Sequence, residues 1–134
     1  MREVGTAVIV KDGKFLIAQR AKHKEAAGLW EFPGGKREEG ETLQECLERE
    51  LMEEFEIKAE VDEFIMDSLY KYPHGEFLLK VFRVSIPDNA NLILKEHQDL
   101  CWVNVEDMNN YDFSAADLPI IEKLKDLFHK STGD

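Results

Sequence analysis

The sequence predicts an α+β protein built on a mixed β-sheet, and three observations predict it. Strand-like segments, rich in β-branched and aromatic residues, outnumber the helical ones. Two segments carry the period of an amphipathic helix. The 134 residues suffice for one hydrophobic core, and no repeat, low-complexity stretch or linker divides them. Residues 1–134 are therefore predicted to form a single domain.

The chain is predicted to begin with a β-hairpin. Residues 4–10 and 15–18 are strand-like, and Asp12-Gly13 between them is a strong hairpin signal. A loop over about residues 21–28 follows. The next short strand, 29–32, is predicted to end at Pro33-Gly34-Gly35, because this tripeptide terminates strands and frees the backbone.

The clearest helix is predicted over residues 42–54. Thr42 and Glu45 read as a capping box, with Thr42 as the N-cap. Three further strands and a last helix follow, at 59–68, 76–86, 100–105 and 117–130. Pro119 is tolerated only in the first turn of a helix, which fixes where the last one starts.

The net charge of −11 limits the partners of the protein. An acidic surface repels nucleic acid polymers and anionic membranes, since both are bound through Lys and Arg. A small polyanion can bind only if cations bridge it to the protein. Cys46 and Cys101 are expected to be reduced and mostly buried, and the N-terminal residues show no signal-peptide pattern, so a cytoplasmic location is expected.

The helix over residues 42–54 places carboxylates where they are not expected. On a helical wheel, an apolar face forms from Leu43, Cys46, Leu47 and Leu51. Glu50 lies in the middle of this face, and Glu53 and Glu54 lie beside it one turn later. By contrast, Glu45 and Glu48 fall on the opposite, solvated side.

Divalent cations would account for the three inward-leaning glutamates. Burial, mutual repulsion and the helix dipole all disfavour anions at the C-terminal end of a helix. Arg49 and nearby lysines could instead neutralise them, or the helix could be an ordinary acidic surface. Mg2+ prefers oxygen ligands, and Glu50, Glu53, Glu54 and a Gly34–Gly35 carbonyl could supply them. Metal-activated water attacking a phosphorus is the chemistry that such a site favours.

Residues 35–57 resemble the Nudix box. Gly35 and Glu41 are followed after seven residues by Arg49-Glu50-Leu51-Met52-Glu53-Glu54-Phe55-Glu56-Ile57. One position departs from the pattern, because Glu56 stands where a glycine is usual. Glu56 must adopt a left-handed conformation, at about 1–2 kcal/mol, or the turn must differ. Since this position is not a ligand, a modest loss of stability is expected rather than lost activity.

The resemblance extends to MutT-like enzymes and CTP pyrophosphohydrolases over nearly the whole chain. It is carried by 29–36, Glu96-His97-Gln98, Trp102 and 115–121. It implies the Nudix fold, a mixed central sheet sandwiched between helices. It also implies a Mg2+-dependent enzyme, with Mn2+ able to substitute, in which the metal ligands are Gly34, Glu50, Glu53, Glu54 and Glu96.

The resemblance also implies roles for the remaining site residues. Arg49 orients the glutamates by a salt bridge, and Glu41 acts near the metals through water. The general base is left open between Glu53 and Glu96. Arg20 meets the substrate near its phosphates, and Phe32 and Asp117 line the nucleobase pocket.

Taken alone, several of these residues have simpler interpretations. Arg20 would be a surface arginine, Phe32 a core aromatic and Asp117 an acid that caps the last helix. His74, His97 and His129 show no ligand spacing and are interpreted as surface residues or residues behind the site.

The resemblance implies a nucleoside triphosphate pyrophosphohydrolase that releases a nucleoside monophosphate and pyrophosphate. Oxidised purine nucleotides such as 8-oxo-dGTP are the first expectation and cytidine nucleotides the second, in nucleotide-pool sanitising linked to DNA repair. Alternatives are a Nudix hydrolase of sugar nucleotides or dinucleoside polyphosphates, a non-catalytic nucleotide sensor, and an acidic Ca2+-buffering protein. A monomer or a homodimer is expected.

Overall fold

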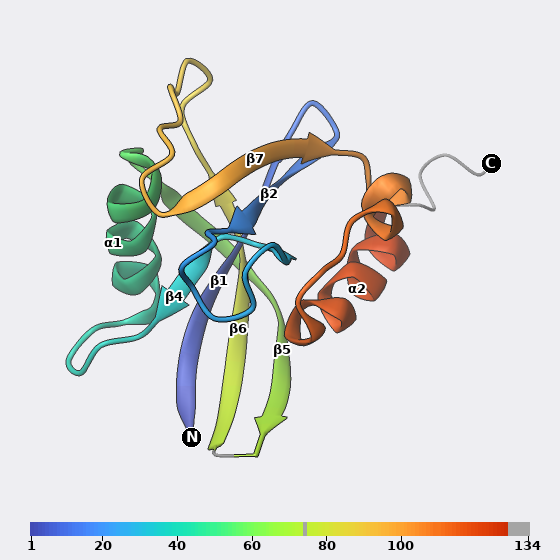
Figure 1. Ribbon diagram of the computed structural model, residues 1–134. Helices are drawn as coiled ribbons and strands as arrows, with labels where there is room; N and C mark the ends of the chain where they lie inside the picture. Colours follow the sequence, from blue (N-terminus) through green and yellow to red (C-terminus); the bar gives the residue numbers. More distant parts are fainter. Residues whose placement is uncertain (74, 129–134) are drawn as a thin grey trace.

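The computed structural model describes residues 1–73 and 75–128, which form one sheet of seven strands with a helix on each side (Figure 1). The predicted α+β class, with a mixed sheet between helices, is confirmed. The elements in chain order are β1 (Arg2–Lys11), β2 (Lys14–Arg20), β3 (Trp30–Glu31), β4 (Gly34–Lys36), α1 (Leu43–Phe55), β5 (Glu60–Tyr72), β6 (Gly75–Ser85), β7 (His97–Val103) and α2 (Leu118–Phe128), with short 3-10 helices at Val105–Asn110 and Ala115–Asp117.

The strand order β3-β2-β1-β6-β5 places β1 at the centre of the sheet. β1 and β6 run parallel, with Val4 opposite Leu79, whereas the other paired strands are antiparallel. A parallel pair cannot be closed by a hairpin, so the chain passes through β2, α1 and β5 before β6 lies beside β1. In addition, β4 pairs with β1 and β7 pairs with β2.

The predicted hairpin between β1 and β2 is present, and its turn has the expected conformation. Asp12 and Gly13 have φ angles of 52° and 77°. Two consecutive positive φ angles match the right-handed twist of the flanking strands, which is why Asp-Gly favours such turns.

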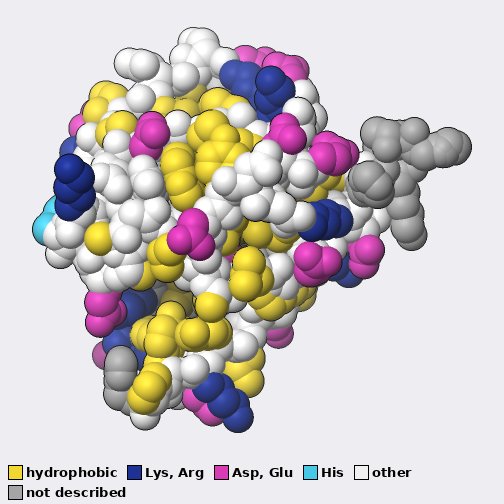
Figure 2. Space-filling view, turned by 45° about the vertical axis from the view of Figure 1, so that its right-hand side comes forward, with side chains coloured by type: hydrophobic (Ala, Val, Ile, Leu, Met, Phe, Trp, Pro, Cys, Tyr) yellow, Lys and Arg dark blue, Asp and Glu magenta, His cyan; other side chains and the backbone are white. Residues whose placement is uncertain are grey.

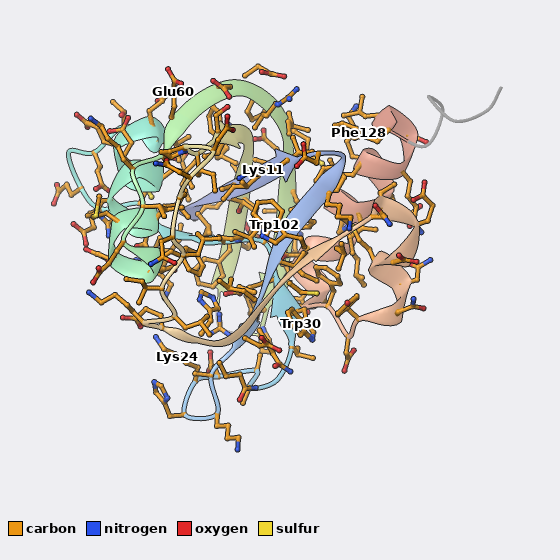
Figure 3. All side chains as sticks on the ribbon, turned by 90° about the horizontal axis from the view of Figure 1, so that it is seen from above. Lys11, Lys24, Trp30, Glu60, Trp102 and Phe128 are labelled. Carbon is orange, nitrogen blue, oxygen red and sulfur yellow. The ribbon has the colours of Figure 1, made fainter. Side chains whose placement is uncertain are left out.

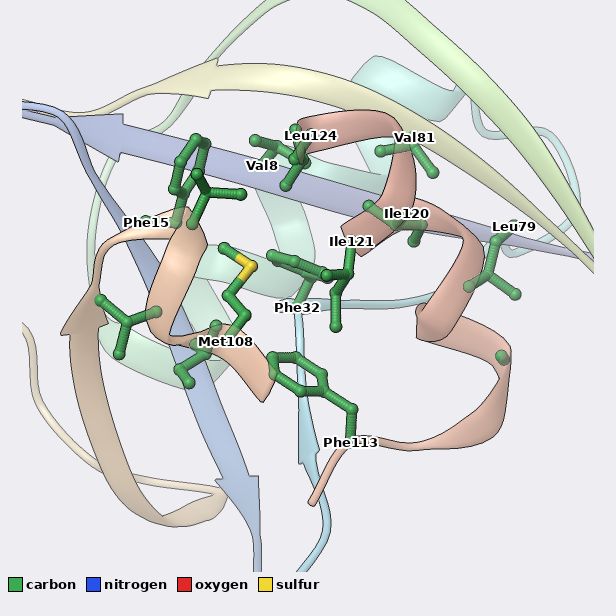
Figure 4. Close-up of a cluster of buried hydrophobic side chains, with 14 residues drawn as sticks. Val8, Phe15, Phe32, Leu79, Val81, Met108, Phe113, Ile120, Ile121 and Leu124 are labelled. Carbon is green, nitrogen blue, oxygen red and sulfur yellow. The ribbon is translucent and has the colours of Figure 1, made fainter. Parts of the chain in front are cut away.

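Side chains alternate along the strands and divide the core into two clusters. On β1, Ala7 and Ile9 face α1 whereas Val8 faces α2, because successive side chains of a strand point to opposite faces. Figure 4 shows the cluster on the α2 side, where Ile120, Ile121 and Leu124 pack over the sheet. The α1 side is filled from the helix by Leu47, Leu51 and Phe55.

Both helices begin close to the predicted residues. The Thr42 hydroxyl accepts the Glu45 N–H at 3.0 Å, and the Glu45 carboxylate accepts the Thr42 N–H at 2.9 Å, which confirms the capping box. α2 starts at Leu118 with Pro119 in its first turn. Its predicted end at residue 130 lies outside the described residues.

Three predicted boundaries differ most from the structure, and each difference has a tertiary cause. Residues 34–36 were expected to be a turn but form β4, because Gly34 and Gly35 pair with the backbone of β1. β5 continues beyond residue 68 to Tyr72, since its end pairs with β6. β7 begins at His97 rather than residue 100, because His97 pairs with Arg20 across a register shift.

The surface mixes apolar and charged side chains. Figure 2 shows hydrophobic side chains gathered on one face, with acidic and basic side chains spread around them. Within the described residues, no helix combines the length and apolar character needed to cross a bilayer. Both cysteines are free, Cys46 buried and Cys101 half-buried.

Replacing Glu56 with glycine is expected to stabilise the protein. Glu56 caps α1 with a φ of 57°, the left-handed conformation that was one of the two expected outcomes. Relief of this strain should raise the free energy of unfolding by about 0.5–1 kcal/mol in urea titrations. The substitution also removes the 2.8 Å ion pair between Glu56 and Lys95, but this pair contributes less to stability than the strain because both side chains are half-exposed. Lys95→Ala measures the contribution of the ion pair. Lower stability of Glu56→Gly than of the wild type would contradict this account.

Candidate active site

A cleft of about 820 Å³ opens beside β1, and it gathers most of the predicted site residues. Except for Arg49 and Glu41, every one of them lines it: Arg20, Phe32, Gly34, Glu50, Glu53, Glu54, Glu96 and Asp117. These residues come from segments far apart in the sequence. The fold therefore assembles a single candidate site from them.

Glu50 and Glu54 project from α1 onto the backbone of β4. A Cβ atom on Gly35 would lie 2.2–2.5 Å from the carboxyl atoms of Glu50, so the carboxylate occupies the space that a side chain would need. The Gly34 N–H lies close enough to Glu54 to lower the pKa of its carboxyl, against the larger effect of burial. The absence of side chains at Gly34 and Gly35 thus allows the acidic face of α1 to approach the sheet closely.

Both carboxyls are withdrawn from water, as the helical wheel predicted. Glu50 retains 16% of its side-chain exposure and Glu54 is 8% exposed as a residue. Burial raises the pKa of Glu50, and burial followed by the charge of Glu50 raises the pKa of Glu54 well above its ordinary value. The Oε1 atom of Glu54 is buried without a hydrogen-bond partner among the described residues. A buried oxygen left in this way is a candidate ligand atom.

The prediction for Glu53 was wrong in one respect. Its side chain is 57% exposed, so it does not share the buried face of Glu50 and Glu54. The physical reason is that β4 covers the side of α1 where Glu50 and Glu54 lie, while Glu53 is turned past its edge toward solvent. Glu53 nevertheless lines the cleft.

Arg49 binds the acidic residues around it. Its Nε lies 2.6 Å from Glu41, and its Nη1 lies 2.9 Å from Glu50 and 3.3 Å from Glu53. The expected salt bridge is therefore present. The hydrogen bond from Arg49, with one from the Glu38 N–H, lowers the pKa of Glu41 to about 2.

The donor set suits a hard divalent cation, although three of its carboxylates, Glu50, Glu53 and Glu96, form ion pairs with basic residues. Glu50, Glu53, Glu54 and Glu96 offer only oxygen atoms, which Mg2+ prefers. As they stand, no three Asp, Glu, His or Cys side chains of residues 1–73 and 75–128 converge closely enough to hold a metal ion. Arg49 forms ion pairs with Glu50 and Glu53. These ion pairs would have to loosen for a cation to bind the same carboxylates. The Oε1 atom of Glu54, which has no hydrogen-bond partner within the described part of the chain, supports binding of a cation at this place.

Glu96 reaches the cleft on a segment that is attached to the end of α1. The N–H groups of Ile93 and Lys95 donate to the carbonyls of Phe55 and Glu54, at 3.1 and 3.3 Å. The Glu96 carboxylate lies 3.3 Å from the Lys24 ammonium. Lys24 belongs to the loop between β2 and β3, which projects from the body of the protein in Figure 3.

Asp117 and Phe32 meet at another part of the cleft. The backbone N–H of Phe32 donates to Asp117 Oδ2 at 2.8 Å. Asp117 is only 5% exposed, and burial raises its pKa to about 8, against the opposing hydrogen bond from Phe32. Asp117 therefore carries a proton near pH 7. The ring of Phe32 packs in the core against Phe113. Phe32 therefore presents only its backbone as a polar group in the cleft.

Two residues of the cleft were missed by the sequence analysis. Glu31 accepts a hydrogen bond from Arg20 at 3.0 Å, and its other carboxylate oxygen lies 2.9 Å from His97 Nε2. The His97 side chain is 5% exposed, so its interpretation as a surface residue was wrong; the alternative, a residue behind the site, stands. A glutamate between Trp30 and Phe32 was the available signal, because a charge within a half-buried strand needs partners. His74 and His129 lie outside the described residues.

Known proteins with similar sequences and structures include nucleotide hydrolases. A model of the NUDIX domain matches residues 5–123. The CTP pyrophosphohydrolase of Escherichia coli K12 is 40% identical over 123 residues, which cover 91% of this chain and 90% of that protein. The 8-oxo-dGTP diphosphatase of the same organism is 32% identical over 117 residues, covering 87% and 90%. The solution structure of the E. coli ORF135 protein superposes with a TM-score of 0.85 at 37% identity, over 100% of this chain and 95% of that one.

An alanine at position 35 is expected to weaken cation binding. The added Cβ would collide with the Glu50 carboxyl, which must then move. The affinity for Mg2+ or Mn2+, measured by calorimetric titration, should fall about 10- to 100-fold, as when the supports of a ligand are removed. Gly13→Ala is the control, because it strains a positive φ but meets no atom within 4 Å. Unchanged affinity in Gly35→Ala would show that Glu50 is not a ligand.

Proposed function

We propose, because this chain belongs to the NUDIX domain family, that it is a MutT-like nucleoside triphosphate pyrophosphohydrolase that sanitises the nucleotide pool. One observation carries the proposal: buried carboxylates of α1 line the same cleft as Arg20 and Asp117. Such a cleft can hold phosphates at one part and a nucleobase at another. We further propose that residues 1–134 work as a single domain.

Members of this family depend on divalent metals, and we propose Mg2+ as the ion, with Mn2+ as a substitute. Glu50, Glu53, Glu54, Glu96 and the Gly34 carbonyl would hold it. When bound, such an ion offsets phosphate charge and makes water more acidic. This positive charge is needed here, because a protein of net charge −11 otherwise repels a polyphosphate.

The side chains of the cleft can take different roles in the hydrolysis of a nucleotide. The oxygen of a water molecule attacks a phosphorus, and the bond from this phosphorus to the bridging oxygen of the leaving group breaks. The proton of the water passes to Glu53 or Glu96, both of which are about half exposed and line the cleft. Arg49 holds Glu50 and Glu53 in place, Glu41 fixes Arg49, and the Arg20 guanidinium meets the phosphates. The products are a nucleoside monophosphate and pyrophosphate.

The protonated carboxyl of Asp117 supports a defined choice of nucleobase. A neutral carboxyl offers one donor and one acceptor, so it matches an edge that presents an acceptor beside a donor. Cytosine presents such an edge at N3 and its exocyclic amine, and 8-oxoguanine at O6 and N7–H. On the same O6/N7 edge, unmodified guanine presents two acceptors, so that edge does not match a neutral carboxyl. We therefore propose oxidised guanine and cytosine nucleotides as substrates.

The partner of the protein is then a small nucleotide rather than a nucleic acid polymer or a membrane. The net charge of −11 supports this, because both polymers and anionic membranes are bound through Lys and Arg. A panel of canonical and oxidised triphosphates, sugar nucleotides and dinucleoside polyphosphates, assayed for monophosphate release, separates the proposed activity from its rivals within the family. A non-catalytic nucleotide sensor would bind members of this panel without turnover.

Removing single carboxylates of α1 tests the catalytic assignment. Glu50→Gln and Glu53→Gln should each lower kcat by about two to four orders of magnitude, while thermal melting shows that the fold persists. Glu48→Gln is the matched control, since Glu48 is exposed on the same helix and does not line the cleft. Unchanged turnover in both test variants would contradict the assignment of Glu50 and Glu53, whereas metal binding by a wild type that hydrolyses no nucleotide would favour a cation-buffering protein.

The pH dependence of binding tests the role of Asp117. Because its pKa is about 8, raising the pH through 8 removes the donated proton, and KM for CTP and 8-oxo-dGTP should rise. Asp117→Asn keeps one donor and one acceptor at every pH, so this rise should be absent. An equal rise of KM in both proteins would contradict the assignment.

Stability gives a second test of the same group. A carboxyl whose pKa is raised by folding favours the folded state only while it is protonated. Wild-type stability relative to Asp117→Asn should therefore fall as pH increases from about 4 to 8 and level off above 8. Denaturant titrations at several pH values measure this difference.

A further inference from the structure

His97 connects the last turn of α1 to the opposite wall of the cleft. Its ring stacks on Phe55, with centroids 5.4 Å apart and planes inclined by 11°. Its Nε2 lies 2.9 Å from Glu31 Oε2, and Glu31 Oε1 lies 3.0 Å from Arg20 Nη1. A second bond holds Arg20, whose Nε donates to the Glu25 carbonyl at 2.7 Å. These contacts form a continuous chain from the acidic helix to the guanidinium.

The direction of the hydrogen bonds in this chain follows from chemistry. A carboxylate without a proton can only accept, so the imidazole presents its N–H at Nε2 toward Glu31. Glu31 then has a donor on each oxygen, His97 on one and Arg20 on the other. Glu31 is thereby held in one orientation between two side chains from different strands.

We propose that His97 is a positioning residue: through Glu31 it fixes the Arg20 guanidinium at a set place relative to the carboxylates of α1. This inference rests on the proposed function, in which Arg20 meets the phosphates. With Nε and Nη1 engaged, Nη2 has no hydrogen-bond partner within residues 1–73 and 75–128 and remains available to a phosphate oxygen. Arginine has many rotamers, so holding it beforehand reduces the entropy lost when substrate binds.

The burial of His97 makes the arrangement rigid. The side chain is 5% exposed and contacts both Phe55 and Glu31. Phe55 is the last residue of α1, follows Glu54 directly and is fully buried. The imidazole therefore takes its position from the same helix that carries the acidic residues. A movement of α1 would be passed on to Arg20 through two short hydrogen bonds.

Two substitutions separate this role from simple packing. His97→Phe keeps a ring on Phe55 but removes the donor to Glu31, whereas His97→Gln keeps a donor and removes the ring. For the proposed substrates, His97→Phe should raise KM about tenfold while kcat changes less than about threefold, the result of losing one hydrogen bond to a charged group. His97→Gln should restore most of the loss. His23→Phe, on the exposed loop, is the matched control.

A double-mutant cycle with Arg20→Ala tests the connection itself. If His97 acts through Arg20, His97→Phe should have no further effect on KM in the Arg20→Ala background. Additive effects of the two substitutions would overturn the proposal. So would a loss of kcat and thermal stability in His97→Phe at unchanged KM, which would indicate a packing role.

A measurement without turnover keeps the two proposals distinguishable. The Arg20 Nη1–H group, which donates to Glu31, should be protected from solvent exchange in the wild type, His97→Gln and His23→Phe when it is followed by nitrogen-15 NMR. In His97→Phe this protection should be lost. If it persists, the positioning role is excluded even when the enzyme is active. If the wild type hydrolyses no nucleotide, the proposed function fails, while the exchange data still decide how Arg20 is held.

Discussion

The contact between the Glu50 carboxylate and the bare backbone of Gly35 sets the geometry on which the site depends. β4 can lie on β1 because Gly34 has a φ of 148° and a Cβ there would lie 2.0 Å from the Gly5 carbonyl oxygen. α1 can then approach β4 because Gly35 has no side chain. This approach withdraws Glu50 and Glu54 from water. Backbone sterics thus produce the unusual electrostatics of the helix.

The buried carboxylates explain why Arg49 has so many acidic partners. Burial raises the pKa of Glu50, and burial followed by the charge of Glu50 raises the pKa of Glu54. Arg49 supplies positive charge from one side, and Glu41 holds it there. A divalent cation placed among the same oxygens would supply more charge at shorter range. The described arrangement is therefore suited to exchange one source of positive charge for another.

Glu31 joins the parts of the cleft that would hold the phosphates and the base. Its negative charge raises the pKa of both Glu54 and Asp117, so it lies within electrostatic reach of each. Arg20 and His97 fix its orientation. A substitution of Glu31 would therefore alter the phosphate-binding part and the base-binding part of the cleft together. For a nucleotide hydrolase, this links recognition of the base to the placement of the phosphates.

Local patterns in the sequence determined the hairpin at Asp12-Gly13, the capped start of α1 at Thr42 and the acidic face of that helix, because each depends on residues close along the chain. Tertiary structure alone decided that Glu54 is buried while Glu53 is exposed. Helical period gives the direction of a side chain, but only the position of β4 shows what covers it. The pairing of Glu31 with His97, 66 residues later, likewise required the fold, since no local pattern reports which distant strands become neighbours.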